Sequence, residues 1–190
     1  MSTKLCLLGP LLIMISCTGA NYQSMAINEP EKLIGMQDSL LARGNANQGL
    51  IQAITKAHNK LGREALYSDN LTSAKKHFQA SLSLLPKDTT AKYYQFIVQG
   101  RLLMATGKKN KIWDAIEIFG KCAWIQAKKG EHHYWTGQAY QKIGDTDFDL
   151  ILEAYQKAIS KDLPPHLLIK TTQAIENQSA RKKTLEDFWK

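Results

Sequence analysis

Lys56, Asn59 and Arg63 are spaced so that all three would lie on one face of a helix, because positions i, i+3 and i+7 return to the same side. Such a face can bind a carboxylate, since the side chains of Arg and Asn both donate hydrogen bonds to carboxylate oxygens. The ligand would then be an acidic peptide segment or a peptide carboxylate. The alternative is an ordinary solvated helix face.

Catalytic signatures are absent from the sequence, which contains no HExxH, GxSxG, phosphate-loop or paired CxxC motif. His132 and His133 are adjacent, so a helix would point them about 100 degrees apart and they would not share one metal as an i, i+4 pair does. We therefore expect no enzyme activity, no metal and no cofactor. A rival interpretation is a cell-wall hydrolase with Glu117 or Glu153 as general acid, which would need a raised carboxyl pKa in a cleft.

The elements that position these residues are predicted to be helices. Helical periodicity continues from residue 29 to the end of the chain, and no stretch alternates with the period of two that strands require. The length of 190 residues fits one domain, and an apolar content of 44% is enough for a packed core. We expect an all-α fold that occupies residues 29–190.

The helices are predicted to repeat in pairs. The segment 55–88 carries five markers in a fixed order: Leu61, Gly62, Ala74, Phe78 and Pro86. Segments 93–129 and 130–164 carry weaker copies, whose markers are Gly100, Gly107, Ala115 and Phe119 in one and Gly137, Tyr140, Gly144, Tyr155, Ala158 and Pro164 in the other. In each copy a glycine would let the paired helix approach closely, and an aromatic ring would fill the space between the helices.

This order of residues resembles the tetratricopeptide repeat (TPR) family. The resemblance implies a short right-handed superhelix of stacked antiparallel helix pairs, and it makes 165–189 a capping helix. It also implies a concave groove lined by the first helix of each pair. The groove positions carried over from the family are Lys56, Asn59, Arg63, Leu66, Tyr94, Arg101, Met104, Tyr134, Gln138 and Gln141.

The beginning of the chain has the pattern of a signal peptide. An apolar run from Leu5 to Ile15 follows Lys4, and at 11 residues it is shorter than the roughly 20 that span a bilayer. The sequence "MISC" that ends in Cys17 resembles a lipobox, the bacterial lipoprotein signal. The resemblance implies removal of residues 1–16, acylation of Cys17 and, because Thr18 replaces the aspartate associated with inner-membrane retention, the periplasmic face of the outer membrane. An ordinary cleaved signal that ends nearby is the alternative.

Residues 17–28 are polar and unpatterned, so we expect a lipidated tether between the anchor and the folded domain. Removal of residues 1–16 takes Cys6 away, and acylation would occupy Cys17. Cys122 would then be the last free cysteine, and we expect it to be buried and unreactive.

The net charge of +8 falls to +7 when residues 1–16 are removed. Outside the cytoplasm this surplus favours anionic lipid headgroups, acidic polymers or acidic protein segments over nucleic acid. Basic clusters at 108–111, 128–129 and 181–183 are explained by solvated loops and helix ends, or by contact with headgroups. Trp113 and Trp124 are 11 residues apart, which suits a binding surface, core packing or a partly exposed ridge.

The sequence as a whole favours a membrane-anchored, non-enzymatic adaptor that binds another envelope protein through an acidic segment. Its combination of lipid anchor and helical repeats resembles that of pilotins and of outer-membrane assembly lipoproteins. The rivals are the cell-wall hydrolase and a surface module for anionic polymer.

Overall fold

The computed structural model of the protein describes residues 16–42, 47–144 and 146–190, with side chains from residue 21 onward. These residues form ten α-helices and no β-strand. The helices are α1 (Ser16–Asn28), α2 (Pro30–Gly35), α3 (Gln37–Ala42), α4 (Gln48–Tyr67), α5 (Leu71–Leu84), α6 (Thr89–Ala105), α7 (Lys109–Ile125), α8 (Glu131–Ile143), α9 (Phe148–Ile159) and α10 (Pro165–Phe188). The all-α prediction is confirmed.

Short polar side chains set the starts of three of these helices. The side chain of Asn47 accepts a hydrogen bond from the backbone N–H of Leu50 at 2.8 Å, and that of Asn70 accepts one from Ser73 at 3.0 Å. Asp88 does the same for Thr90 at 2.9 Å. Each bond satisfies a donor that a helix start would otherwise leave without a partner.

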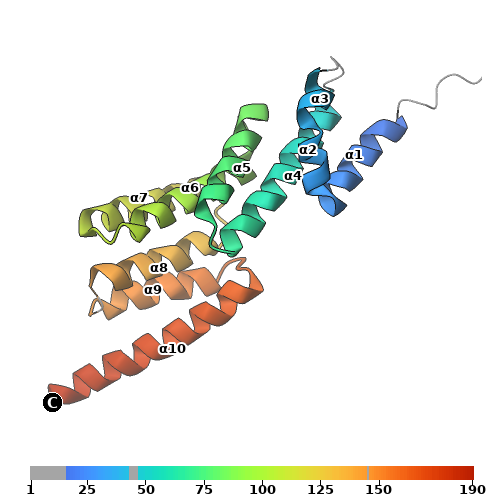
Figure 1. Ribbon diagram of the computed structural model, residues 1–190. Coiled ribbons are helices and arrows are strands. Elements are labelled where there is room, and N and C mark those ends of the chain that lie inside the picture. Colours follow the sequence, from blue (N-terminus) through green and yellow to red (C-terminus); the bar gives the residue numbers. More distant parts are fainter. Residues whose placement is uncertain (1–15, 43–46, 145) are drawn as a thin grey trace, which may run out of the picture.

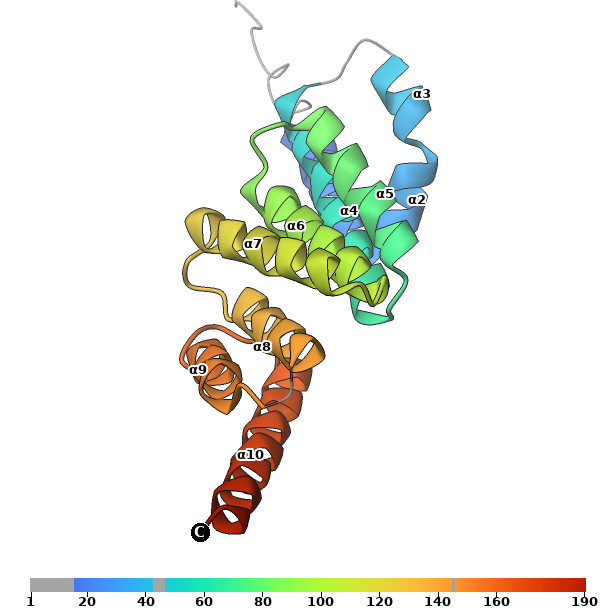
Figure 2. The same ribbon diagram turned by 90° about the vertical axis from the view of Figure 1, so that its left-hand side faces the viewer.

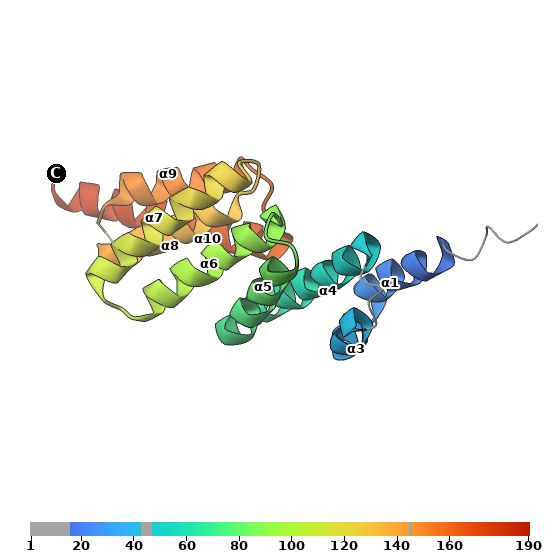
Figure 3. The ribbon, with the colours of Figure 1, turned by 90° about the horizontal axis from the view of Figure 1, so that it is seen from above.

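Three antiparallel helix pairs, α4–α5, α6–α7 and α8–α9, stack side by side, and α10 packs along α9 as a cap (Figures 1 and 2). The three pairs correspond to the three repeats expected from the sequence. The first helix of the first pair begins at Gln48, seven residues before the predicted start of that repeat. Figure 3 shows α1 and the C-terminal end of α10 at opposite ends of the molecule.

Glycine and aromatic residues hold each pair together as the repeat pattern predicts. A Cβ atom on Gly62 would lie 2.7 Å from the ring of Phe78, and one on Gly137 would lie 2.6 Å from the ring of Tyr155. Gly100 meets Phe119 in the same way in the middle pair. Since real Cβ atoms do not come this close to ring carbons, the two helices of each pair reach their observed separation because the first carries a glycine.

The hydrophobic core runs through the stack. One cluster of buried side chains joins α4 to α8, and Phe78, Phe119 and Cys122 belong to it. Tyr155 lies in a second cluster, which joins α8, α9 and α10. The core is therefore shared between neighbouring pairs, as expected of stacked repeats.

The expectation of an unpatterned tether at residues 17–28 is wrong, because this segment belongs to α1 (Ser16–Asn28). Ala26 is fully buried, and the side-chain amide of Gln23 donates a hydrogen bond to the carbonyl of Gly49 at 3.1 Å. The segment lacks a strong apolar stripe of its own, so its helix depends on packing against α4.

The helical segment that follows residue 28 is divided into α2 and α3 at Met36, and Glu29 precedes α2. The rest of the predicted signal peptide, residues 1–15, lies outside the described residues, as does the side chain of Cys17. Of the helices described, none has both the length and the apolar character to cross a bilayer.

Candidate peptide-binding groove

The three residues predicted to share one face of α4 differ in their exposure to solvent. Lys56 and Arg63 are exposed, whereas Asn59 is buried. The amide of Asn59 donates a hydrogen bond to the carboxylate of Asp88 at 2.5 Å, and the hydroxyl of Ser81 donates to the same oxygen at 2.9 Å. Asn59 thus connects α4 to the junction between α5 and α6, and this amide N–H is already used.

Four predicted groove residues are buried: Leu66, Tyr94, Met104 and Tyr134. The ring of Tyr94 stacks on Phe78 with 5.5 Å between the ring centroids, and the ring of Tyr134 packs against Tyr155 at 6.0 Å. Most of the surface of these side chains contributes to the core. Only small parts of them, such as the hydroxyl of Tyr94, reach a pocket.

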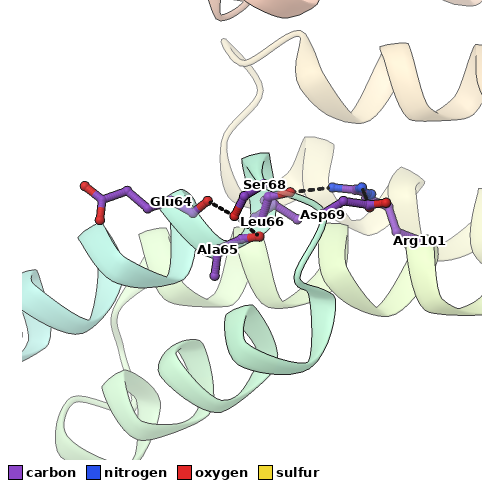
Figure 4. Close-up of polar contacts among 6 residues, drawn as sticks. All are labelled: Glu64, Ala65, Leu66, Ser68, Asp69 and Arg101. Atoms are coloured by element: carbon purple, nitrogen blue, oxygen red, sulfur yellow. Dashed lines mark hydrogen bonds and ion pairs between the residues drawn. The ribbon is translucent and has the colours of Figure 1, made fainter.

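Arg101 is held by the C-terminal end of α4 (Figure 4). Its guanidinium donates a hydrogen bond to the carbonyl of Leu66 at 2.9 Å and forms an ion pair with Asp69. The same group lies 4.2 Å from the centroid of the Trp135 ring, in a cation–π contact. Arg101 therefore ties α6 to the end of α4 and to α8.

The two glutamines of α8 both bind the hydroxyl of Tyr155. Gln138 donates to it at 2.6 Å, and Gln141 accepts from it at 2.7 Å. Of the ten groove positions carried over from the repeat family, Lys56 and Arg63 thus keep exposed and unengaged polar groups in the described part of the chain. The role of the set in peptide binding stays a prediction.

A pocket of about 270 Å³ lies where the three helix pairs meet the start of α10. Its lining comprises Arg63, Tyr67, Tyr94, Lys129, Glu131 and residues 162–165. Two backbone hydrogen bonds close its rim, from the N–H of Gly130 to the carbonyl of Asp162 at 2.7 Å and from the N–H of Asp162 to the carbonyl of Lys128 at 2.9 Å. A Cβ on Gly130 would collide with the carbonyl of Ala158, so this close approach requires glycine.

Glu131 is a buried carboxyl at the base of this pocket, with 2% of its surface exposed. One carboxylate oxygen accepts a hydrogen bond from the hydroxyl of Tyr67 at 3.2 Å, and the other oxygen has no hydrogen-bond partner among the residues that the structure describes. Burial raises the pKa of Glu131 to about 7, against the opposing effects of Trp135, Tyr67, Lys129 and Arg101. The sequence analysis missed this residue, because nothing in its local pattern marks it as buried.

Lys129 also lines this pocket. Its ammonium group donates a hydrogen bond to the hydroxyl of Tyr94 at 3.3 Å and lies 5.3 Å from the centroid of that ring. The hydroxyls of Tyr67 and Tyr94 are 3.4 Å apart, and the ring of His166 meets Tyr67 edge-on at 4.6 Å. A chain of polar contacts therefore joins Glu131 to Lys129.

A second pocket, of about 500 Å³, is lined by residues 69–72 and by Arg101, Met104, Trp135, Gln138 and Lys142. Its residues on α6 and α8 belong to the first helices of the second and third pairs. The two pockets together place Arg63, Arg101, Lys129 and Lys142 along the inner side of α4, α6 and α8. The lining also includes Asp69, which pairs with Arg101, as well as Asp162 and the buried Glu131, so cations and acids are mixed. The exposed Arg63 and the aromatic side chains suit the carboxylate and the apolar parts of an acidic peptide segment.

Several other predicted features have clear positions. Cys122 is fully buried, and burial followed by the nearby Glu131 raises the pKa of its thiol, as expected of an unreactive cysteine. Glu117 and Glu153 are exposed and form ion pairs with Lys121 at 2.9 Å and Lys157 at 2.6 Å. Neither therefore provides the buried carboxyl that the hydrolase interpretation requires.

Two histidines make contacts that the sequence did not predict. His132 is buried with one ring nitrogen 3.3 Å from the hydroxyl of Tyr93, and His58 lies between His77 at 3.1 Å and the side-chain oxygen of Gln37 at 2.9 Å. No group of three or more metal-binding side chains gathers among the described residues.

The fold and the pockets define a small all-α protein of stacked helix pairs, with two pockets whose linings combine charged and aromatic side chains. No protein-family profile matches the sequence, and no curated protein matches it. A solved structure of MamA (residues 41 to the end) from Desulfovibrio magneticus RS-1 is similar with a TM-score of 0.46 and 17% identity, over 85% of this chain and 92% of that one. We draw no conclusion about function from this likeness.

Proposed function

We propose that the protein is a non-enzymatic scaffold of the bacterial envelope that binds an acidic segment of a partner protein on the inner side of α4, α6 and α8. The observation that carries this proposal is the pocket lined by Arg63 of α4 and by Lys129, which lies between α7 and α8. Asp162 and the buried Glu131 line the same cavity. A carboxylate entering there could reach both cations, and Tyr67 offers a ring, 41% of whose residue surface is exposed, for the apolar part of the ligand.

The test compares charge variants at the pocket with a matched control. Arg63→Glu combined with Lys129→Met should weaken binding of a fluorescent hexaglutamate peptide on the order of tenfold or more, because two charge-assisted contacts are lost. Lys75→Glu combined with Lys76→Met alters two exposed lysines of α5 by the same charges and should leave binding unchanged. Arg101 is unsuited to this test, because its loss would also release the end of α4.

Equal weakening by the two double variants would mean that net charge alone attracts the peptide. That outcome would refute peptide binding at this pocket and would favour a general module that binds anionic polymers. Capture of envelope proteins by the lipidated protein in intact cells, with and without the pocket substitutions, would then identify the partner.

We further propose that Cys17 is acylated and holds the protein at the periplasmic face of the outer membrane. The support is the apolar run from Leu5 to Ile15, which is followed directly by Ser16 and Cys17. The backbone of Cys17 belongs to the first turn of α1, which packs on α4, so an acyl chain at this position would hold the helix pairs close to the bilayer. Labelling with a fatty-acid analogue should be lost in Cys17→Ser, and equal labelling of both proteins would refute the anchor.

A further inference from the structure

The outer face of α7 carries two exposed tryptophans. Trp124 is 93% exposed and Trp113 is 49% exposed. Eleven residues of helix bring the two side chains to within about 20 degrees of the same direction and separate them by about 16 Å. Gly120 lies between them on this face, and no atom comes within 4 Å of the position that its Cβ would occupy.

This tryptophan face is rigid, because the opposite side of α7 is part of the core. Ala115, Phe119 and Cys122 are fully buried there. The ring of Trp113 is also steadied by an edge-on contact with Tyr140 at 6.2 Å between centroids. The alignment of the two indoles on one rigid helix face, more than the exposure of either ring alone, indicates an interaction surface.

The charges around the tryptophan face are positive at both ends. The two acids of α7 are each paired with a lysine of the same helix, Asp114 with Lys111 and Glu117 with Lys121, both at 2.9 Å. Lys108 and Lys109 at the start of the helix, and Lys128 just beyond its end, are exposed and form no ion pair within the described residues. About 26 Å of helix therefore carries two indoles between two cationic ends.

We infer that the tryptophan face of α7 binds the surface of an anionic lipid bilayer. Indole rings are stable at the level of the headgroups, where the ring is partly in an apolar medium and its N–H stays hydrated. Lysines at both ends can extend their ammonium groups to lipid phosphates while their stems remain close to the surface. The negatively charged surface of a bilayer can bind the lysines at both ends of α7 at the same time.

A second copy of the chain fits this face less well. Two copies related by a two-fold axis along this surface would bring lysine-bearing ends together, and the like charges would repel each other. The bilayer proposal does not depend on acylation of Cys17 or on the peptide pocket, since no side chain of α7 lines either pocket described above.

The test measures contact between Trp124 and lipid in the full chain carrying Cys17→Ser. A variant that keeps Trp124 alone, with Trp113, Trp135 and Trp189 replaced by Phe, is mixed with vesicles that contain brominated phosphatidylcholine, with or without phosphatidylglycerol. We expect the fluorescence of Trp124 to be quenched in the vesicles with phosphatidylglycerol, with much weaker quenching in their absence or at high salt. A matched variant that keeps Trp189 alone should not be quenched to the same extent.

Substitution of Lys108, Lys109 and Lys128 by Gln should weaken vesicle binding on the order of tenfold or more, since each cation near an anionic surface contributes to the affinity. The control with the same charge change replaces Lys75, Lys76 and Lys183. The proposal is overturned if Trp124 is not quenched, if the two vesicle types quench it equally, or if its emission shifts with protein concentration in the absence of lipid, which would indicate self-association.

Discussion

The hydroxyl of Tyr67 donates a hydrogen bond to the carboxylate of Glu131 at 3.2 Å, across 64 positions of the sequence. This contact joins the last residue of α4 to the first residue of α8, and hence the first helix pair to the third. The contact lies at the candidate peptide pocket. The carboxyl group of Glu131 therefore affects both the stability of the stacked helix pairs and the charge of the pocket.

Glu131 should make the protein less stable as the pH rises toward 8. Its folded-state pKa of about 7 lies above the ordinary value of 4.5, so the folded protein binds the proton more tightly than the unfolded chain does. The resulting stabilisation is complete below about pH 4.5 and is lost as the pH rises through 7. Glu131→Gln, which cannot ionise, should therefore gain on the order of 1–3 kcal/mol relative to wild type between pH 4 and pH 8.

The measurement is the free energy of unfolding of both proteins in denaturant across that pH range. Glu117→Gln controls for the loss of one negative charge at an exposed position. A difference between wild type and Glu131→Gln that stays constant with pH would contradict the prediction.

His58, in contrast, should make the protein less stable as the pH falls. Burial and then the neighbouring His77 lower its pKa to about 4, so between pH 6.5 and 4 the unfolded chain binds the proton more tightly than the folded protein. This contribution to stability is present above pH 6.5 and is lost as the pH falls through 4. His58→Gln should reduce the loss of unfolding free energy between pH 7 and pH 4.5. The pKa of His166 is also lowered, by partial burial and then by Lys170, but this residue is exposed, so His166→Gln should reduce that loss less than His58→Gln does.

Gly62→Ala should destabilise the first helix pair by about 1–3 kcal/mol, because the new methyl group would overlap the ring of Phe78. Gly120→Ala is the matched control on the open face of α7, and there the higher helix propensity of Ala should stabilise by up to about 1 kcal/mol. Thermal unfolding of the two variants should therefore shift in opposite directions. A shift of Gly62→Ala to higher temperature would show that Phe78 can move aside.

Arg101→Met should lower the unfolding free energy by about 1–3 kcal/mol, since the carbonyl of Leu66 and the carboxylate of Asp69 lose their common donor. Arg63→Met removes an exposed cation that has no ion-pair partner among the described residues, and it should change stability by no more than about 0.5 kcal/mol. Equal effects of the two substitutions would contradict the structural role assigned to Arg101.

The helix pairs were predictable because their signals are local or regularly spaced. Gly62 and Phe78 are 16 residues apart in one repeat, and the same kind of pair recurs as Gly100 with Phe119 and Gly137 with Tyr155. The helix at 16–28 was not predictable in this way. Its sequence lacks a clear apolar stripe, and its stability comes from burying Ala26 against α4.

The candidate site was predicted only in part. The groove positions carried over from the repeat family correctly placed Lys56 and Arg63 at the surface. They did not indicate that Asn59, Arg101, Gln138 and Gln141 would be engaged in contacts between helices. Helical spacing gives the direction of a side chain around its own helix, but not the neighbour that it meets.

The sequence by itself determined the all-α class, the three helix pairs and the buried thiol of Cys122, because helical periodicity and repeated glycine–aromatic spacing are local properties. The tertiary structure alone decided that Tyr67, Tyr94, Lys129 and Glu131 surround one pocket, and that Trp124 is left exposed on α7. The pocket residues come from different helices, so their distances, burial and pKa values depend on how the pairs stack.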